Sequence, residues 1–342
     1  MIGLDSIRLE VGSDAIRDID LNSSNLQRTT RQDILNDGIV SEIIHTKESP
    51  CIGLKSVAYD NYKQCAVVDL SAKILKERYF DLITPNTVER VFEEVNKYSP
   101  ITFTIPMAME IARVRAMDCT NNLRVEEDPQ RYVDALYQVR ANERYNVTFH
   151  REHGNSGVVM SGKQKTFKER QIIYVKSFDL LRDKRMTKEP YFDAVLRDHN
   201  GILRVESNYT SFDRIRKCTG SADLLLKTVL NSTEHPNLSL FNKITSRIPD
   251  NQLMLHLERG KFAGMTLHQI EKRIGMEGII RELDFDMVRI SHFINTARSK
   301  GSKNSKVIRQ YRNLLTEIMP TEGNVIQLRN LLIEEIRIKL AS

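Results

Sequence analysis

Three short segments of the sequence each carry one chemically capable residue among apolar neighbours. They centre on Asp118, Tyr174 and Glu206. Lys176 follows Tyr174 by two residues, so on a strand the two side chains share a face. A tyrosine hydroxyl, with a pKa of about 10, is a poor nucleophile at neutral pH until a neighbour stabilises the phenolate or the transition state. Lys176 could lower that pKa or neutralise a phosphate.

The two carboxylates form a candidate metal site that accompanies the tyrosine. If Asp118 and Glu206 converge beside Tyr174, their oxygens suit Mg²⁺ or Mn²⁺. Such an ion polarises a scissile phosphate and orients it for in-line attack. The three residues together predict metal-assisted phosphoryl transfer with a tyrosine nucleophile.

Each residue also has an ordinary structural interpretation. Tyrosine is common on strands, where it is half-buried. Asp118 could begin a turn or cap at the end of a strand. Glu206, beside Arg204, could belong to a cross-strand ion pair. The residue types alone leave both interpretations open.

The first two-thirds of the chain read mainly as strands. Residues 2–11 alternate, with Ile7, Leu9 and Val11 on one face and Arg8 and Glu10 on the other. Other short β-rich runs cover 38–45, 54–59, 65–70, 109–120, 145–149, 157–160, 171–176 and 202–208. Helical patterns cover 84–98, with an apolar stripe, and 129–139. Because strands and helices do not alternate regularly, the pattern predicts an α+β domain on an antiparallel sheet.

Beyond residue 218 the periodicity becomes helical. The expected helices cover 222–230, 251–258, 266–274, 278–283, 287–296, 307–319 and 325–340. The pair on either side of Gly275 is typical of a helix-turn-helix, or of a generic helix that ends at a glycine cap. The prediction is a domain over residues 1–218 followed by a helical domain over residues 219–342.

The residues of these segments and their order along the chain resemble those of the replication initiators of filamentous phages, the gene II/X type of phage and plasmid replication protein. More distantly, they resemble the rolling-circle initiators of Gram-positive plasmids. The likeness covers roughly residues 1–215 and is carried by five short stretches in the same order: Met1–Glu10, Val67–Leu75, Asp118–Thr120, Ile172–Lys176 and Leu203–Glu206. The family arginine two residues before the acid is Ala116 here, and Arg115 lies one residue earlier.

This resemblance implies a role for each matching residue. Tyr174 would be the nucleophile, Lys176 its basic neighbour, and Asp118 and Glu206 the ligands of Mg²⁺ or Mn²⁺. The implied activity is endonuclease and strand-transferase chemistry in DNA replication: nicking and rejoining one strand at an origin through a 5′-phosphotyrosine, which leaves a 3′ hydroxyl to prime synthesis. A non-enzymatic DNA-binding replication regulator with the same fold is the alternative. A tyrosine recombinase fits less well, because Tyr174 is mid-chain and is accompanied by carboxylates.

Two basic runs suit DNA phosphates. Residues 161–188 contain nine Lys or Arg against three Asp or Glu, and residues 298–312 contain six cations and no acid. A solvated hairpin is the ordinary interpretation of the first run. The expected DNA contacts are Lys163, Lys165, Lys168, Arg170, Arg204, Arg298, Lys300, Lys303 and Lys306. His150 and His153, three residues apart, would point to opposite faces of a strand and are not assigned as ligands.

Composition restricts the class of protein. The 342 residues carry a net charge of +6, with 40% hydrophobic residues, so a packed core is expected. The cysteines, four in number, form no C-x-x-C pair and are expected to be reduced thiols. From its pattern we do not expect the start of the chain to act as a signal peptide, and no apolar run reaches membrane-helix length. We expect a protein of the bacterial host cytoplasm. Its partners would be single-stranded or hairpin origin DNA, with a host helicase and a second copy of the chain as further candidates.

Overall fold

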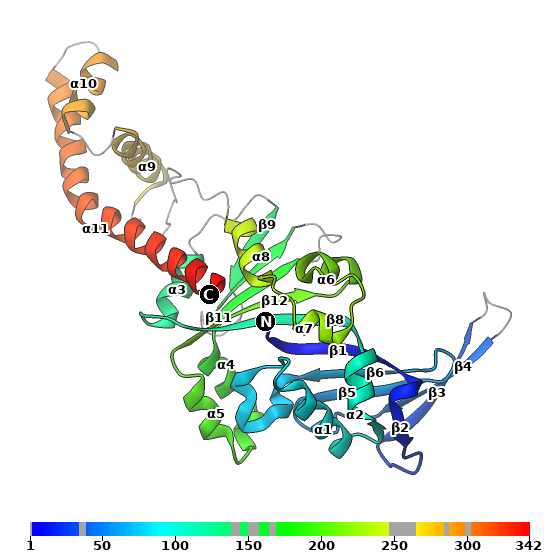
Figure 1. Ribbon diagram of the computed structural model, residues 1–342. Coiled ribbons are helices and arrows are strands. Elements are labelled where there is room, and N and C mark those ends of the chain that lie inside the picture. Colours follow the sequence, from blue (N-terminus) through cyan, green and yellow to red (C-terminus); the bar gives the residue numbers. More distant parts are fainter. Residues whose placement is uncertain are drawn as a thin grey trace. The chain divides into compact units, whose positions relative to one another are not determined.

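The structure is a computed structural model that describes residues 2–33, 39–137, 144–149, 157–163, 169–245, 265–283, 287–297 and 302–342. Its strands are β1 (Leu4–Gly12), β2 (Ile16–Ile19), β3 (Leu26–Asp33), β4 (Ile39–Thr46), β5 (Leu54–Asp60), β6 (Cys65–Ser71), β7 (Ile101–Phe103), β8 (Arg113–Arg124), β9 (Tyr145–Phe149), β10 (Gly157–Gly162), β11 (Arg170–Val175) and β12 (Ile202–Tyr209) (Figure 1).

The helices lie between these strands and after them. The α-helices are α1 (Val88–Tyr98), α2 (Ile105–Ile111), α3 (Pro129–Tyr137), α4 (Lys176–Arg182), α5 (Phe192–Asp198), α6 (Phe212–Thr219), α7 (Leu226–Leu230), α8 (Pro236–Thr245), α9 (Leu267–Glu282), α10 (Met287–Ala297) and α11 (Ser302–Ala341). The short 3-10 helices are η1 (Ser13–Ala15), η2 (Ala72–Asp81) and η3 (Met186–Lys188).

One large antiparallel sheet organises the first two-thirds of the chain. Its strand order is β3-β4-β5-β6-β1-β8-β12-β11-β10-β9, and each neighbouring pair is antiparallel. Strands β2 and β7 form a separate two-stranded sheet. The prediction of an α+β architecture on antiparallel sheet is therefore confirmed. The sheet brings β8, β12 and β11, which carry the three chemically capable residues, side by side.

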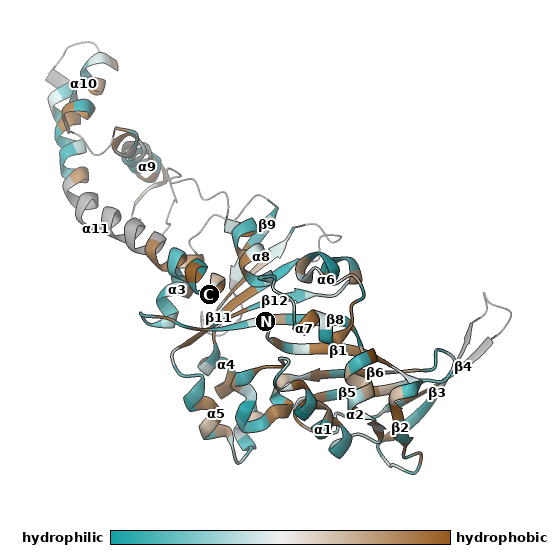
Figure 2. Cartoon of the chain, in the orientation of Figure 1, coloured by the Kyte–Doolittle hydropathy of each residue, from teal (hydrophilic) through white to brown (hydrophobic). Residues whose placement is uncertain are grey.

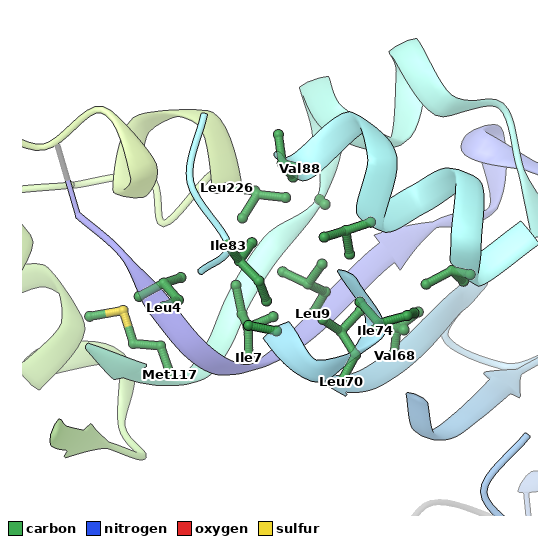
Figure 3. Close-up of a cluster of buried hydrophobic side chains, with 14 of the residues drawn as sticks. Leu4, Ile7, Leu9, Val68, Leu70, Ile74, Ile83, Val88, Met117 and Leu226 are labelled. Atoms are coloured by element: carbon green, nitrogen blue, oxygen red, sulfur yellow. The ribbon is translucent and has the colours of Figure 1, made fainter. Parts of the chain in front are cut away.

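The core lies on one face of this sheet. In β1 the alternation holds as predicted, because Ile7, Leu9 and Val11 are buried while Arg8 is exposed. Figure 3 shows the side chains from β1, β6 and β8 meeting those of η2, α1 and α7 in this core. The predicted apolar stripe of α1 is buried as a whole. Figure 2 shows the corresponding alternation of apolar and polar residues along the strands.

The same face continues toward β12 and β11, where α8 covers it. The Asn237 side chain on α8 donates to the backbone carbonyls of Cys119 and Val205. The buried Gln171 side chain donates to the Ser207 hydroxyl and the Asn237 carbonyl. Residues of the opposite register, including Tyr174, Glu206 and Asp118, therefore lie on the other face of the sheet.

Several predicted elements differ from the observed ones. Residues 109–111 belong to α2, which begins with a proline in its first turn, so the strand starts at Arg113. The predicted turn at Gly275 is wrong, because α9 runs through it without interruption. Apolar residues of α9 pack with α10 and α11, and this packing outweighs the low helix propensity of glycine. The two helices predicted around Pro320 are one helix, α11.

The chain divides into two compact units. The first contains Met1–Arg247 together with Glu335–Ser342, and the second contains Ile248–Glu334. Residues 219–247, which sequence analysis placed in the helical domain, belong to the first unit because α7 and α8 pack on the large sheet. The first unit also takes in the last turns of α11, where Arg337 bonds to Asn242 of α8.

Two expectations, on the cysteines and on membrane-spanning helices, can be compared with the structure of the described residues. The thiols of Cys51, Cys65, Cys119 and Cys218 are free, as predicted. Among the residues described, no helix combines the length and the apolar character needed to span a membrane.

Candidate functional site

Tyr174, Glu206 and Asp118 lie on three neighbouring strands of the large sheet. In the register, Tyr174 of β11 is opposite Arg204 of β12, and Asn208 of β12 is opposite Asp118 of β8. Opposed residues share a face, and so do residues two apart on one strand. The three residues therefore project from one face, on the neighbouring strands β8, β12 and β11. Asp118 lies in the middle of β8 and not at a strand end, which excludes a role as a turn or cap.

Tyr174 makes the closest contact in this group. Its hydroxyl donates to Glu206 Oε1 over 2.6 Å, and Lys176 Nζ lies 3.2 Å from the same hydroxyl oxygen. Lys176 is the first residue of α4 and not a strand residue as expected, yet it reaches Tyr174 from the helix start. The ammonium group is buried and is paired with Asp179 at 2.9 Å. One phenol thus has a carboxylate and an ammonium beside its oxygen.

Burial decides which groups of this cluster carry a proton. Burial, followed by the charge of Glu206, raises the pKa of Tyr174 well above its usual value, so the hydroxyl is a neutral donor. Lys176 therefore does not bring the pKa of Tyr174 below its usual value. Burial and then the charge of Asp5 raise the pKa of Glu206 to about 7. A carboxylate with that pKa exchanges a proton near neutral pH, which suits it to accept one from Tyr174.

Arg204 forms the base of the site. Its side chain is fully buried, and its three nitrogens donate to neighbouring side chains on four elements: Nε to Asn122, one terminal nitrogen to Asp5 and Tyr79, and the other to His199. The Glu206 carboxylate is 3.7 Å away. The sequence predicted Arg204 as a DNA contact. Because the guanidinium has no exposed surface and is committed to protein partners, it positions the site instead.

His199 has a definite tautomer in this network. Arginine can only donate, so His199 Nε2 accepts from Arg204 over 2.9 Å. Nδ1 must then carry the proton and donate to the Val195 carbonyl over 2.8 Å. Burial, reinforced by the charge of Arg204, lowers the pKa of His199 to about 3. The imidazole therefore stays neutral and locks the guanidinium in place from behind.

Asp5 belongs to the site, although the residue types of the sequence did not identify it as a functional residue. Its carboxylate accepts from Tyr79 over 2.7 Å and from Arg204 over 2.8 Å. Burial opposes its ionisation, but the charges of Arg204 and Lys176 outweigh burial and hold its pKa at about 2. The register shifts between Leu4 and Ser6, and this bulge directs Asp5 toward the polar face. Strand alternation could not find it, because a bulge breaks the period of two.

The carboxylates can be tested against the chemistry of Mg²⁺ and Mn²⁺. Within the described residues, no group of three or more His, Cys, Asp or Glu side chains could hold a metal ion. Mg²⁺, however, usually takes one or two carboxylates and completes its shell with water and phosphate oxygens. Asp118 and Glu206 are diagonal neighbours on β8 and β12, and burial raises the pKa of both. This donor set fits an ion completed by substrate, and it does not fit a closed protein cage.

The predicted DNA contacts fall into several groups. Lys163 and Arg170 are exposed near the meeting point of β10 and β11, and Lys306 is exposed on α11. The described residues do not include Lys165, Lys168, Arg298 or Lys300, nor the Lys303 side chain. His150 and His153 also lie outside the described residues.

No family model matches this chain, and no curated protein matches it either.

Proposed function

We propose that the chain is a rolling-circle replication initiator that nicks and rejoins one DNA strand through Tyr174. The observation that carries the proposal is the hydrogen bond from Tyr174 to Glu206 with the Lys176 ammonium beside the same oxygen. A phenol with a proton acceptor and a cation at its oxygen is an arrangement suited to nucleophilic attack on phosphorus. The resemblance to phage initiators in the order of the segments supports the same activity.

The steps follow from the residues. As the Tyr174 oxygen attacks the scissile phosphorus, its proton passes to Glu206, and Lys176 balances the charge that develops on the oxygen. The bond from phosphorus to the 3′ oxygen breaks, and that oxygen leaves with the electron pair and takes a proton from Glu206 or water. The products are a 5′-phosphotyrosine and a 3′ hydroxyl. Rejoining is the reverse, with the 3′ hydroxyl as nucleophile and Tyr174 as leaving group.

The tyrosine must become accessible for this reaction. Its side chain is only 4% exposed. Tyr79, on η2, lies against the same cluster, and Lys176 Nζ is 5.2 Å from the Tyr79 ring and 5.3 Å from the Tyr174 ring. The proposal therefore requires that η2 or the Tyr174 side chain moves when DNA binds.

We include Mg²⁺ or Mn²⁺ in the proposal, with Asp118 and Glu206 as its protein ligands. When bound, the ion would polarise the scissile phosphate. Mn²⁺ binding to the DNA-free chain, followed by calorimetry, should be lost in Asp118→Asn. Asp69→Asn is the matched control, since Asp69 lies on the same face but is already paired with Arg8 and Lys55. Equal Mn²⁺ affinity in all three proteins would exclude Asp118 as a ligand.

The central test is the tyrosine itself. Tyr174→Phe should abolish nicking of an origin-bearing supercoiled plasmid and the covalent adduct seen on a denaturing gel, while DNA binding persists. Tyr145→Phe is a matched control, because Tyr145 is also buried on the sheet and donates to a glutamate, Glu169, at 2.5 Å. That variant should nick as the parent does. A Tyr174→Phe protein that still cuts would refute the proposal.

The burial of Tyr174 favours one alternative, a non-enzymatic DNA-binding replication regulator. This alternative predicts salt-sensitive DNA binding by the parent chain and no covalent product with labelled single-stranded origin DNA. In either case we propose that the second unit serves DNA or partner binding, with a host helicase as one candidate. Formation of the adduct by the parent chain decides between initiator and regulator.

A further inference from the structure

A row of polar side chains crosses the open face of the large sheet, with one shift of two residues along β1. On one side of the shift Ser56 is opposite Asp69 and Asp69 opposite Arg8. From Ser6, two residues from Arg8 on the same strand, the row continues with Ser6 opposite Asp118, Asp118 opposite Asn208, Asn208 opposite Arg170, Arg170 opposite Ser161, and Ser161 opposite Asn146. The row thus passes over β5, β6, β1, β8, β12, β11, β10 and β9. We call it the polar row.

The polar row is continuous at its centre and joins the candidate site. Asn208 donates to Asp118, and Lys55 Nζ contacts the Ser6 hydroxyl at 3.4 Å. Glu206 is two residues from Asn208 on β12, so it projects from the same face one step along the strand. A ligand lying along the row would pass beside the Tyr174 and Glu206 pair.

Exposed cations stand on both sides of the centre. The Arg8 and Lys55 side chains are 54% and 55% exposed, and both reach Asp69, at 2.6 and 3.8 Å. Arg170 is exposed on the other side. From β5 to β11 the row crosses five strand spacings, roughly 24 Å at about 4.8 Å each. Cations separated in this way, with amides and hydroxyls between them, suit a flexible chain of phosphates and bases.

We propose that the polar row is the path of single-stranded DNA, with phosphates held by Arg8 and Lys55 on one side of the site and by Arg170 on the other. This inference rests on the proposed function and gives its substrate a direction across the sheet. A row that spans five strand spacings, roughly 24 Å, is wider than the major groove of a duplex, about 12 Å. An unpaired strand can lie along it and present a phosphate to a recessed tyrosine. Two of the three cations, Arg8 and Lys55, come from outside the basic runs of the sequence.

The test is the salt dependence of binding by the full chain to fluorescein-labelled oligothymidine, measured by anisotropy. Each phosphate contact on a single strand adds about 0.7 to the slope of log K against log salt. The double variant Arg8→Ala with Lys55→Ala should lower the slope by about 1.4, and Arg170→Ala by about 0.7. Lys63→Ala is the control, since Lys63 is 60% exposed in the β5–β6 turn and paired with Asp60. It should leave the slope unchanged.

A second variant separates binding from structural damage. Asp69→Asn removes an anion from the row while keeping its shape, so it should tighten oligothymidine binding several-fold. If Asp69 served only to hold Arg8 and Lys55 in position, its replacement would instead weaken binding. The inference is overturned if the double variant keeps the parent slope or if Asp69→Asn binds more weakly. Tyr174→Phe should bind normally here, so failure of the nicking mechanism and failure of the path give different results.

Discussion

Arg204 is the residue on which the geometry of the candidate site depends. Its three nitrogens fix Asp5, Tyr79, Asn122 and His199, and its charge lies 3.7 Å from Glu206. A buried arginine with every nitrogen bonded costs less than one left unpaired, because each donor is satisfied. The network therefore gives the Tyr174 and Glu206 pair a rigid support. Removing any one member leaves a buried polar group without its partner.

At this scale the pH dependence of stability is a direct prediction. The pKa of Glu206 rises from 4.5 to about 7 on folding, so between those values the folded chain holds a proton that the unfolded chain has lost. The contribution of Glu206 to stability should therefore fall as pH rises across this range, by at most about 1.4 kcal/mol per pH unit. His199 contributes with the opposite sign below about pH 6.5, because its folded pKa of about 3 lies below its usual value of 6.5. Asp5, with a folded pKa of about 2, loses its contribution only below this range.

Urea unfolding between pH 5 and pH 8 in the presence of EDTA measures the effect. Glu206→Gln should remove the falling contribution, so that its stability changes more positively with pH than that of the parent. Glu169→Gln is the control, because the pKa of Glu169 is lowered in the fold, where burial is outweighed by the bonds from Lys243 and Tyr145. That variant should keep the slope of the parent between these pH values. A slope unchanged in Glu206→Gln would mean that another group titrates.

The alternation of the sequence predicted which residues of a regular strand share a face, but it could not predict departures from regularity. It placed Asp118, Tyr174 and Glu206 correctly on strands, but it gave no order of those strands in the sheet. Asp5 was missed because of the bulge in β1, and Tyr79 because its helix, η2, has no helical pattern. The contact between η2 and β12 spans 125 residues of sequence. Such contacts depend on tertiary packing, which local periodicity does not encode.

Among the elements, η2 has the most demanding backbone. Lys76 and Leu82 have positive φ angles of 58° and 59°, and Tyr79 between them donates to Asp5. Non-glycine residues in such conformations persist only where the surroundings hold them. Gly53 is part of those surroundings, because its carbonyl accepts from the Ser71 amide and it lies against the start of η2.

Substitution of Gly53 tests how closely η2 is held. A Cβ at this position would lie 2.1 Å from the Ile74 backbone nitrogen, and Gly53 has a φ of +92°. Gly53→Ala should therefore lower the free energy of unfolding by several kcal/mol, or displace η2. Gly201→Ala is the control: its φ is +70°, but nothing lies within 4 Å of the new Cβ. It should cost only about 1–2 kcal/mol in urea unfolding. Equal costs would show that the close approach to η2 is unimportant.

At the scale of the whole molecule, the net charge of +6 conceals an uneven distribution. The runs at 161–188 and 298–312 each carry a surplus of six cations, so the rest of the chain is acidic on balance. In the fold the first run divides, because Lys176 is buried in the site while Lys163 and Arg170 are exposed on the sheet. The exposed pair Arg8 and Lys55 comes from the acidic remainder. A count along the sequence therefore predicts only part of the cationic surface.

The end of α11 provides a prediction about the first unit. Ile336 is fully buried, whereas Ile338, two residues later on the same helix, is 62% exposed. Ile336→Ala should destabilise the first unit by about 2–5 kcal/mol, and Ile338→Ala should have an effect within about 0.5 kcal/mol. Thermal unfolding followed by near-ultraviolet circular dichroism compares the two. Matching melting temperatures would mean that the last turns of α11 do not support this unit.

The return of residues 335–342 to the first unit has a consequence for biosynthesis. Tyr132 donates to Glu335 and Arg337 donates to Asn242, so the unit that holds Tyr174 is completed by residues that are translated only after the second unit. Domains generally fold as they emerge from the ribosome, at about 5–20 residues per second. Here the intervening 87 residues of the second unit, Ile248–Glu334, must be made first. The nascent first unit would therefore wait several seconds for these helix turns, and a chain terminated before residue 335 would lack them.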